Sequence, residues 1–183
     1  MSFCLIILAG GNSHRFGSNI GKPYQKLGGK SLIEINVSKA LQFKAIKQII
    51  LVYNKKDSKK VKSLKLKNVK LISGGKSRRE STLNALKYLI KQKGINKVLI
   101  HDVARPNFSL KLFSTILKKI KSARAVVPMI KVQDAIKQII DSSREEYIVG
   151  KKRDNLFLTQ TPQAFKLKEI YHLHKTNSRK YKD

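Results

Sequence analysis

Short apolar runs that alternate with amphipathic stretches constrain the fold of this chain most strongly. Runs of strand length occupy Phe3–Leu8, Gln48–Tyr53, Val69–Ile72, Lys97–Ile100 and Ala125–Met129. Apolar residues recur at helical spacing over Ser31–Leu41, Ser81–Ile90 and Leu110–Ile120, and Ser31 with Glu34 has the pattern of a helix N-cap. This alternation predicts an α/β fold with a Rossmann-like, mostly parallel sheet and helices on both faces. Ligands of such sheets bind at the carboxyl ends of the strands.

The region from residue 132 to 158 departs from this alternation. Val132–Ile140 alternates at roughly strand period, residues 141–143 are turn-like, and Tyr147–Val149 is apolar again. This pattern predicts a projecting β-hairpin arm within a single domain that covers residues 1–183. Apolar residues on such an arm need a cover, and a second copy of the chain is the simplest one. We therefore expect a homodimer.

The first strand ends in a glycine-containing loop that carries two basic residues. Ala9, Gly10 and Gly11 follow the apolar run, and Arg15 and Lys22 come shortly after. Glycines let consecutive N–H groups approach an anion, and the cations add positive charge. The spacing matches neither a Walker A loop nor Gly-x-Gly-x-x-Gly. Taken alone, the loop is either a nucleotide-phosphate site or a plain glycine-rich turn with solvated cations.

Two further polar clusters follow predicted strands. Residues 73–81 include Gly75, Lys76, Arg78 and Ser81 and open a helix, which suits an anion or the polar edge of a ligand. His101–Pro106 follows the strand at 97–100. A carboxylate at that point, Asp102, could hold Mg²⁺ beside a phosphate loop, or could cap the next loop. We expect His101 to orient the loop rather than to act as a base.

Composition limits the partners of the protein. The net charge is +29, but most of the 40 basic residues are lysines spread from Lys22 to Lys182. Arginine, the better residue for base and bidentate phosphate contacts, is scarce. We therefore attribute the charge to solvated lysines and expect no nucleic-acid partner. The single cysteine excludes an internal disulfide, and no apolar run is long enough for a membrane span. A cytoplasmic protein is expected.

Four motifs together resemble one family, the 2-C-methyl-D-erythritol 4-phosphate cytidylyltransferases of isoprenoid biosynthesis. After the first loop come Gly74-Gly75-x-x-Arg78-x-x-Ser81 and His101-Asp102-x-Ala104-Arg105-Pro106, and then Asp134–Lys137 and Thr161-Pro162-Gln163-x-Phe165. The first loop is shared by many nucleotidyltransferases, whereas the combination in this order is specific. The resemblance extends from residue 3 to about residue 174.

The resemblance implies a reaction and a role for each motif. CMP is transferred from CTP to the 4-phosphate of methylerythritol phosphate, and pyrophosphate leaves. Arg15 and Lys22 match the pair that stabilises the transition state, Arg153 matches the arginine that positions the attacking phosphate, and Asp102 matches a carboxylate that holds Mg²⁺. The expected substrate-binding residues are Ala9, Gly10, Gly11, Gly75, Lys76, Arg78, Ser81, Asp102, Ala104, Arg105, Asp134 and Lys137. The arm is expected to clasp a partner subunit.

The family pattern continues beyond the last residue of this chain. Members carry a further phosphate-binding lysine and a second metal carboxylate in that segment. We therefore expect weak binding of CTP–Mg²⁺ and slow turnover from residues 1–183 alone. Another nucleotidyltransferase activity of the same fold, or nucleotide binding without turnover, remains an alternative.

Overall fold

A computed structural model of the chain describes residues 2–11, 21–141 and 146–176. The chain forms two compact units, one made of residues 1–126 with 161–183 and the other of residues 127–160. We refer to them as unit 1 and unit 2 and describe each by itself. No helix within the described residues is long and apolar enough to cross a membrane.

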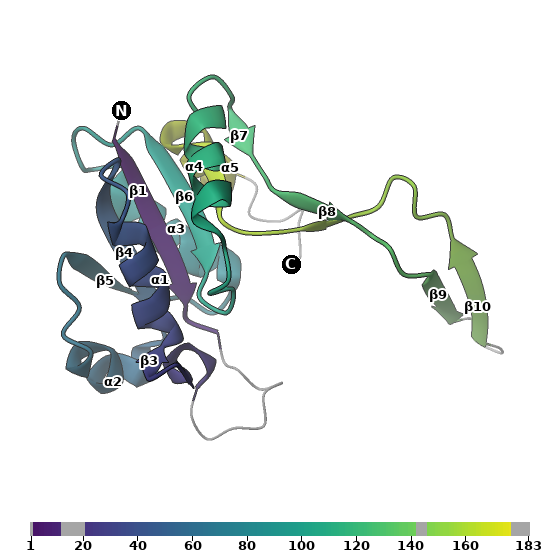
Figure 1. Ribbon diagram of the computed structural model, residues 1–183, viewed down its shortest axis with the longest axis horizontal. Helices are drawn as coiled ribbons and strands as arrows, with labels where there is room; N and C mark the ends of the chain where they lie inside the picture. Colours follow the sequence, from purple (N-terminus) through teal and green to yellow (C-terminus); the bar gives the residue numbers. More distant parts are fainter. Residues whose placement is uncertain (1, 12–20, 142–145, 177–183) are drawn as a thin grey trace. The chain divides into compact units, whose positions relative to one another are not determined.

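Unit 1 is built on a six-stranded sheet in the order β5-β4-β1-β6-β12-β7 (Figure 1). The strands are β1 (Phe3–Ala9), β4 (Ile46–Tyr53), β5 (Val69–Ser73), β6 (Lys97–Asp102), β7 (Ala125–Val126) and β12 (Gln163–Lys166). β5, β4, β1 and β6 pair in parallel, whereas β12 pairs antiparallel with both β6 and β7. The predicted mostly parallel sheet is confirmed.

The alternating side chains of β1 separate two hydrophobic layers. Phe3, Leu5 and Ile7 pack in one buried cluster with residues of α1 (Leu32–Leu41) and α4 (Leu110–Lys119). Cys4, Ile6 and Leu8 pack in the other with residues of α3 (Arg78–Leu89) and α5 (Leu167–Thr176). Every residue of β1 is buried, which explains why its sequence is an unbroken apolar run. Helices therefore cover both faces of the sheet, as predicted.

Helices α1 and α3 each begin directly after a serine that caps the helix N-terminus. The predicted cap of α1 is confirmed, since the Glu34 amide donates to Ser31 Oγ at 3.2 Å and the Ser31 amide donates to Glu34 Oε2 at 2.8 Å. α3 begins at Arg78 and not at Ser81, because Ser77 accepts a hydrogen bond from the Glu80 amide at 3.0 Å. The Ser-x-x-Glu spacing of residues 77–80 is the signal for this earlier start.

Short elements connect the main ones in unit 1. They are η2 (Lys22–Tyr24), β2 (Lys26–Leu27), β3 (Lys30–Ser31), η3 (Lys55–Asp57) and α2 (Ser58–Ser63). β2 and β3 pair antiparallel and lead into α1. The Tyr24 amide donates to the Gly21 carbonyl and the Leu32 amide to the Gln25 carbonyl, so the segment after residue 21 is held against the start of α1.

Unit 2 consists of two antiparallel ribbons. β9 (Ile136–Asp141) pairs with β10 (Glu146–Lys151), and β8 (Met129–Lys131) pairs with β11 (Phe157–Thr159). The predicted hairpin is confirmed, although its first strand begins at Ile136 and not at Val132. Exposed apolar side chains lie along both ribbons, at Met129, Ile130, Ile139, Val149, Leu156, Phe157 and Leu158.

The predicted strand Ala125–Met129 is wrong as a single element. β7 ends at Val126, and β8 starts a separate ribbon at Met129. Pro128 lies between them and has no N–H to donate to a strand ladder, while its carbonyl accepts a hydrogen bond from the Gln160 amide. The chain therefore leaves the central sheet at this point.

Candidate functional site

A glycine cradle lies at the carboxyl ends of β1, β4 and β5. The Gly74 amide donates to the Tyr53 carbonyl at 2.8 Å, across the ends of β5 and β4. A Cβ on Gly74 would stand 2.9 Å from Ser81 Oγ and 3.2 Å from the Tyr53 carbonyl oxygen, and one on Gly10 would stand 3.7 Å from Ser81 Oγ. Gly10, Gly74 and the predicted residue Ser81 therefore lie together. Glycine at position 74 is required by this close approach.

Hydrogen bonds to α3 shape the turn that follows Gly74. Ser81 is buried, and its Oγ accepts a hydrogen bond from the Gly75 amide at 3.0 Å. The Lys76 amide donates to Glu80 Oε2 at 2.8 Å. The first turn of α3 thus fixes the backbone of the two predicted residues Gly75 and Lys76, and the Lys76 side chain is exposed.

Asp102 lies between two arginines at the carboxyl end of β6. Its Oδ1 accepts hydrogen bonds from Arg78 Nη2 at 3.1 Å and Nε at 3.2 Å, and Arg105 Nε is 3.7 Å from its Oδ2. The Asp102 side chain is 29% exposed, and the arginine side chains are 45% and 43% exposed. One carboxylate between two cations leaves net positive charge facing solvent, which suits an anionic ligand. The structure thus brings three predicted residues together.

His101 is buried beneath this cluster. Its side chain is 0% exposed, its Nε2 lies 2.8 Å from Asn36 Oδ1 and 3.1 Å from the Arg105 carbonyl oxygen, and its Nδ1 lies 2.9 Å from Thr161 Oγ1. Burial lowers the pKa of the imidazole to about 4, and the Asp102 carboxylate opposes this shift to a smaller degree. A neutral, enclosed ring fits the predicted role in orienting the loop.

Two residues of α1 support the same loop and were missed in the sequence analysis. The Asn36 side-chain amide donates to the Val103 carbonyl at 3.0 Å, and Lys39 Nζ donates to the carbonyls of Pro106 at 2.6 Å and Phe108 at 3.2 Å. Asn36 is fully buried beside the apolar face of α1. A polar residue within an apolar helical stripe is the signal that could have identified it.

The other predicted residues of unit 1 lie at the same edge of the sheet or outside the described residues. Ala9 is the buried last residue of β1, Gly11 follows Gly10, and Ala104 is exposed in the loop after β6. Lys22 opens η2 and is half-buried. Arg15 lies outside the described residues.

Three predicted residues belong to unit 2. Asp134, Lys137 and Arg153 are exposed there, and the Arg153 guanidinium donates to the Gln133 carbonyl. This contact lies within unit 2, and it ties the base of the hairpin to the loop that carries Asp134.

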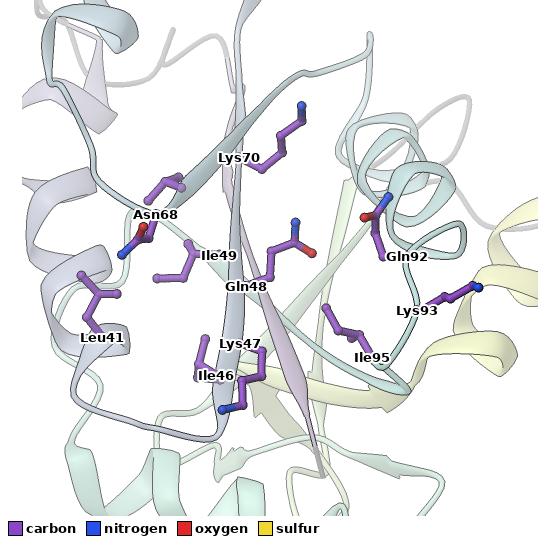
Figure 2. A pocket seen from close by; sticks show the side chains of 11 residues that line it. Leu41, Ile46, Lys47, Gln48, Ile49, Asn68, Lys70, Gln92, Lys93 and Ile95 are labelled. Atoms are coloured by element: carbon purple, nitrogen blue, oxygen red, sulfur yellow. The ribbon is translucent and has the colours of Figure 1, made fainter.

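A separate groove lies at the amino ends of β4 and β5, opposite the glycine cradle. Lys47, Gln48, Asn68, Lys70, Gln92 and Lys93 contribute its polar lining. Figure 2 shows the lysine side chains pointing in different directions rather than toward a common point. None of the predicted site residues that the structure describes lines this groove.

Comparisons with known proteins agree with the motifs. The family described as IspD, 2-C-methyl-D-erythritol 4-phosphate cytidylyltransferase, matches residues 3–183. A bifunctional enzyme IspD/IspF of Pelagibacter ubique is 44% identical over all of this chain, which spans 48% of that relative's length. A bifunctional ribulose 5-phosphate reductase/CDP-ribitol pyrophosphorylase of Haemophilus influenzae is 34% identical over 88% of this chain and 35% of its own length.

A solved structure shows the same architecture. The 4-diphosphocytidyl-2C-methyl-D-erythritol synthase of Anaerococcus prevotii is 31% identical, with a TM-score of 0.82 over 100% of this chain and 80% of its own. The family match covers the β1 loop, the glycine cradle and the Asp102 cluster alike. From its sequence and its fold, the chain belongs to the 2-C-methyl-D-erythritol 4-phosphate cytidylyltransferase family.

Proposed function

We propose that this protein transfers CMP from CTP to 2-C-methyl-D-erythritol 4-phosphate and releases pyrophosphate. The arrangement of Arg78, Asp102 and Arg105 beside the glycine cradle carries the proposal, together with membership of the family. A strand-end cradle in which glycines allow close approach suits a nucleotide. Arginines at the adjacent strand end suit its phosphates.

The proposed step is a direct displacement. An oxygen of the acceptor phosphate bonds to the α-phosphorus of CTP, the bond from that phosphorus to the bridging oxygen breaks, and pyrophosphate carries away the electron pair. Both reactants are anions, so the protein must offset charge and align them. We assign charge stabilisation in the transition state to Arg15 and Lys22, with Arg78 and Arg105 holding nucleotide phosphates.

We propose that the Asp102 carboxylate helps to hold a divalent cation, Mg²⁺, when the nucleotide phosphates are bound. The Asp102 carboxylate is partly exposed at the strand end, and one of its oxygens is approached by Arg105 only at 3.7 Å. No group of three or more His, Cys, Asp or Glu side chains suited to a metal occurs within the described residues. Such an ion would take its other ligands from phosphate oxygens and water, and it would neutralise triphosphate charge when bound.

Unit 2 supplies the proposed acceptor contacts. We assign the positioning of the attacking phosphate to Arg153 and recognition of the polyol phosphate to Asp134 and Lys137. The exposed apolar side chains of this unit support a homodimer in which each arm is covered by a partner subunit.

A second candidate is cytidylyl transfer to a different polyol phosphate. The relative from Haemophilus influenzae, a CDP-ribitol pyrophosphorylase, shares 34% identity over 88% of this chain. Ribitol phosphate is therefore the alternative acceptor. The contacts proposed for CTP are the same in both cases.

A single assay separates these possibilities. ³¹P NMR of CTP, Mg²⁺ and either methylerythritol 4-phosphate or ribitol 5-phosphate reports formation of the CDP-polyol and of pyrophosphate. We expect product with methylerythritol phosphate and CTP, and none when GTP replaces CTP. Product with ribitol phosphate alone would favour the second candidate. CTP binding without product from either acceptor would indicate a nucleotide-binding protein without turnover.

The same assay tests the role of Lys22. Lys22→Ala should lower turnover about 10²- to 10³-fold, because a transition-state contact is lost. The melting temperature should change little, since Lys22 is only half-buried at the start of the short helix η2 and surface changes usually cost less than about 0.5 kcal/mol. Lys26→Ala, on exposed β2, is the matched control and should keep wild-type turnover. Equal turnover of the Lys22 variant and wild type contradicts the assignment.

A further inference from the structure

A buried chain of hydrogen bonds connects three elements of unit 1 beneath Asp102. Asn36 belongs to α1, His101 to β6, and Thr161 lies just before β12. Asn36 and His101 are fully buried and Thr161 nearly so. Burying this many polar groups costs free energy unless each one is hydrogen-bonded. The hydrogen bonds among these side chains therefore offset that cost and fix how the groups are arranged.

The partners define which nitrogen of His101 carries the proton. Nε2 faces two oxygens, Asn36 Oδ1 at 2.8 Å and the Arg105 carbonyl at 3.1 Å. The Asn36 amide nitrogen is already committed to the carbonyls of Leu32 and Val103, which orients its oxygen toward the ring. Nε2 is therefore the donor. Nδ1 accepts from the Thr161 hydroxyl, which lies 2.9 Å away.

The same hydroxyl reaches the backbone of Asp102. Thr161 Oγ1 accepts a hydrogen bond from the Asp102 amide at 3.3 Å while it donates to His101. The Val103 amide donates to the Leu8 carbonyl at 3.1 Å, and the Arg105 amide donates to the Asp102 carbonyl at 3.0 Å. The backbone of residues 102–105 is thus held at successive points, several of them through the His101 ring or its two partners.

We propose that His101 is a positioning residue, which acts with Asn36 and Thr161 to hold Asp102 and Arg105 in the geometry needed at the phosphate site. The ring touches no exposed surface, so it contacts neither substrate nor metal. On one side of the ring Nε2 hydrogen-bonds to the Arg105 carbonyl, and on the other side Nδ1 hydrogen-bonds to the Thr161 hydroxyl, which itself accepts from the Asp102 amide. The expected loss of turnover when this network is disrupted rests on the proposed function, whereas the expected loosening of the backbone of residues 102–105 does not.

The ring also packs in the core, which a test must separate from positioning. Phe108 meets the His101 ring edge-on with centroids 4.8 Å apart. His101→Phe keeps an aromatic ring but leaves Asn36 and Thr161 without their partner, and it risks misfolding. Thr161→Val is the gentler variant, because it keeps the size of the side chain and removes only the hydroxyl. Thr161→Ser restores that hydroxyl.

The first measurement is amide hydrogen exchange. In Thr161→Val and His101→Phe, the amides of Asp102, Val103 and Arg105 should exchange faster, while amides within β1 and β4 keep their protection. Thr161→Ser should return exchange toward wild type. Thr115→Val is the matched control, since that exposed hydroxyl donates to the Lys111 carbonyl within α4. Unchanged exchange at residues 102–105 in both variants would overturn the proposal, whether or not the protein transfers CMP.

The second measurement is a double-mutant cycle on turnover. Thr161→Val should lower kcat by about 10- to 100-fold, as expected for a displaced reacting group, with a much smaller change in KM for CTP. In a background that carries both Asp102→Asn and Arg105→Ala the same change should have little further effect, because both positioned groups are already lost. Additive losses would overturn the proposal. An inactive wild type refutes the proposed function, and hydrogen exchange then decides the positioning role alone.

Discussion

Replacing Gly74 by alanine should test the glycine cradle directly. The added Cβ would stand 2.9 Å from Ser81 Oγ and 3.2 Å from the Tyr53 carbonyl oxygen. Ser81 Oγ accepts a hydrogen bond from the Gly75 amide, and the Tyr53 carbonyl accepts one from Gly74 itself. Neither atom can retreat without weakening a hydrogen bond, so the ends of β4 and β5 must separate.

The cost follows from this overpacking. Inserting a methyl group into a tightly packed site costs about 1–3 kcal/mol. For a chain of this length, each 1 kcal/mol lowers the melting temperature by about 2–4 °C, so a loss of about 2 kcal/mol corresponds to about 4–8 °C. Binding of CTP should weaken as well, because the displaced backbone of Gly74 and Gly75 belongs to the proposed nucleotide cradle.

Thermal melts and urea titrations measure the first effect, and titration calorimetry with CTP measures the second. Gly11→Ala is the matched control, because a Cβ there meets nothing within 4 Å. The control should keep the stability of wild type to within about 0.5 kcal/mol. If Gly74→Ala has the melting temperature and the CTP affinity of wild type, the close approach of Gly74, Ser81 and Tyr53 is not a feature of the folded protein.

Two further predictions concern His101 and the arm. Burial lowers the pKa of His101 from 6.5 to about 4, so the folded state resists a proton that the unfolded chain accepts. This contribution to stability is complete above about pH 6.5 and is lost as the pH falls toward 4; it amounts to about 2 kcal/mol between pH 7 and pH 5. Urea titrations of the metal-free protein should show a free energy of unfolding that falls between pH 7 and pH 5 in wild type but not to the same degree in His101→Phe. Plots of this free energy against pH that run parallel for the two proteins would refute the prediction. Sedimentation at micromolar concentration should give a dimer that Phe157→Asp converts to a monomer, whereas monomeric wild type would exclude the arm as an interface.

The central sheet was predictable because its signal is local. An all-buried parallel strand such as β1 needs an unbroken apolar run, and an amphipathic helix such as α4 needs apolar residues at helical spacing. The N-cap at Ser31 is likewise a local signal, since Ser31 and Glu34 lie within four residues of sequence. The predicted residues after β1, after β5 and at the end of β6 lie at one edge of the sheet for a related reason, since the carboxyl ends of parallel strands share that edge.

Other features were missed because their causes are distant or combine several elements. The antiparallel pairing of β12 with β6 depends on how the chain returns after unit 2, and no local pattern of residues 163–166 records its direction. The strand predicted at Ala125–Met129 divides because Pro128 cannot continue the ladder. The start of α3 was set three residues late, although Ser77 and Glu80 carried a readable capping signal.

The sequence by itself determined the class of fold, the family and the chemical types at the site, because periodicity and motif spacing survive without coordinates. Only the tertiary structure decided which of those residues meet. Arg78 reaches Asp102 because the start of α3 and the end of β6 lie at the same edge of the sheet, although they are 24 residues apart. Asn36, His101 and Thr161 form one network for the same reason. Hydrogen bonds between residues so far apart depend on strand order and helix packing, and no single stretch of sequence contains that information.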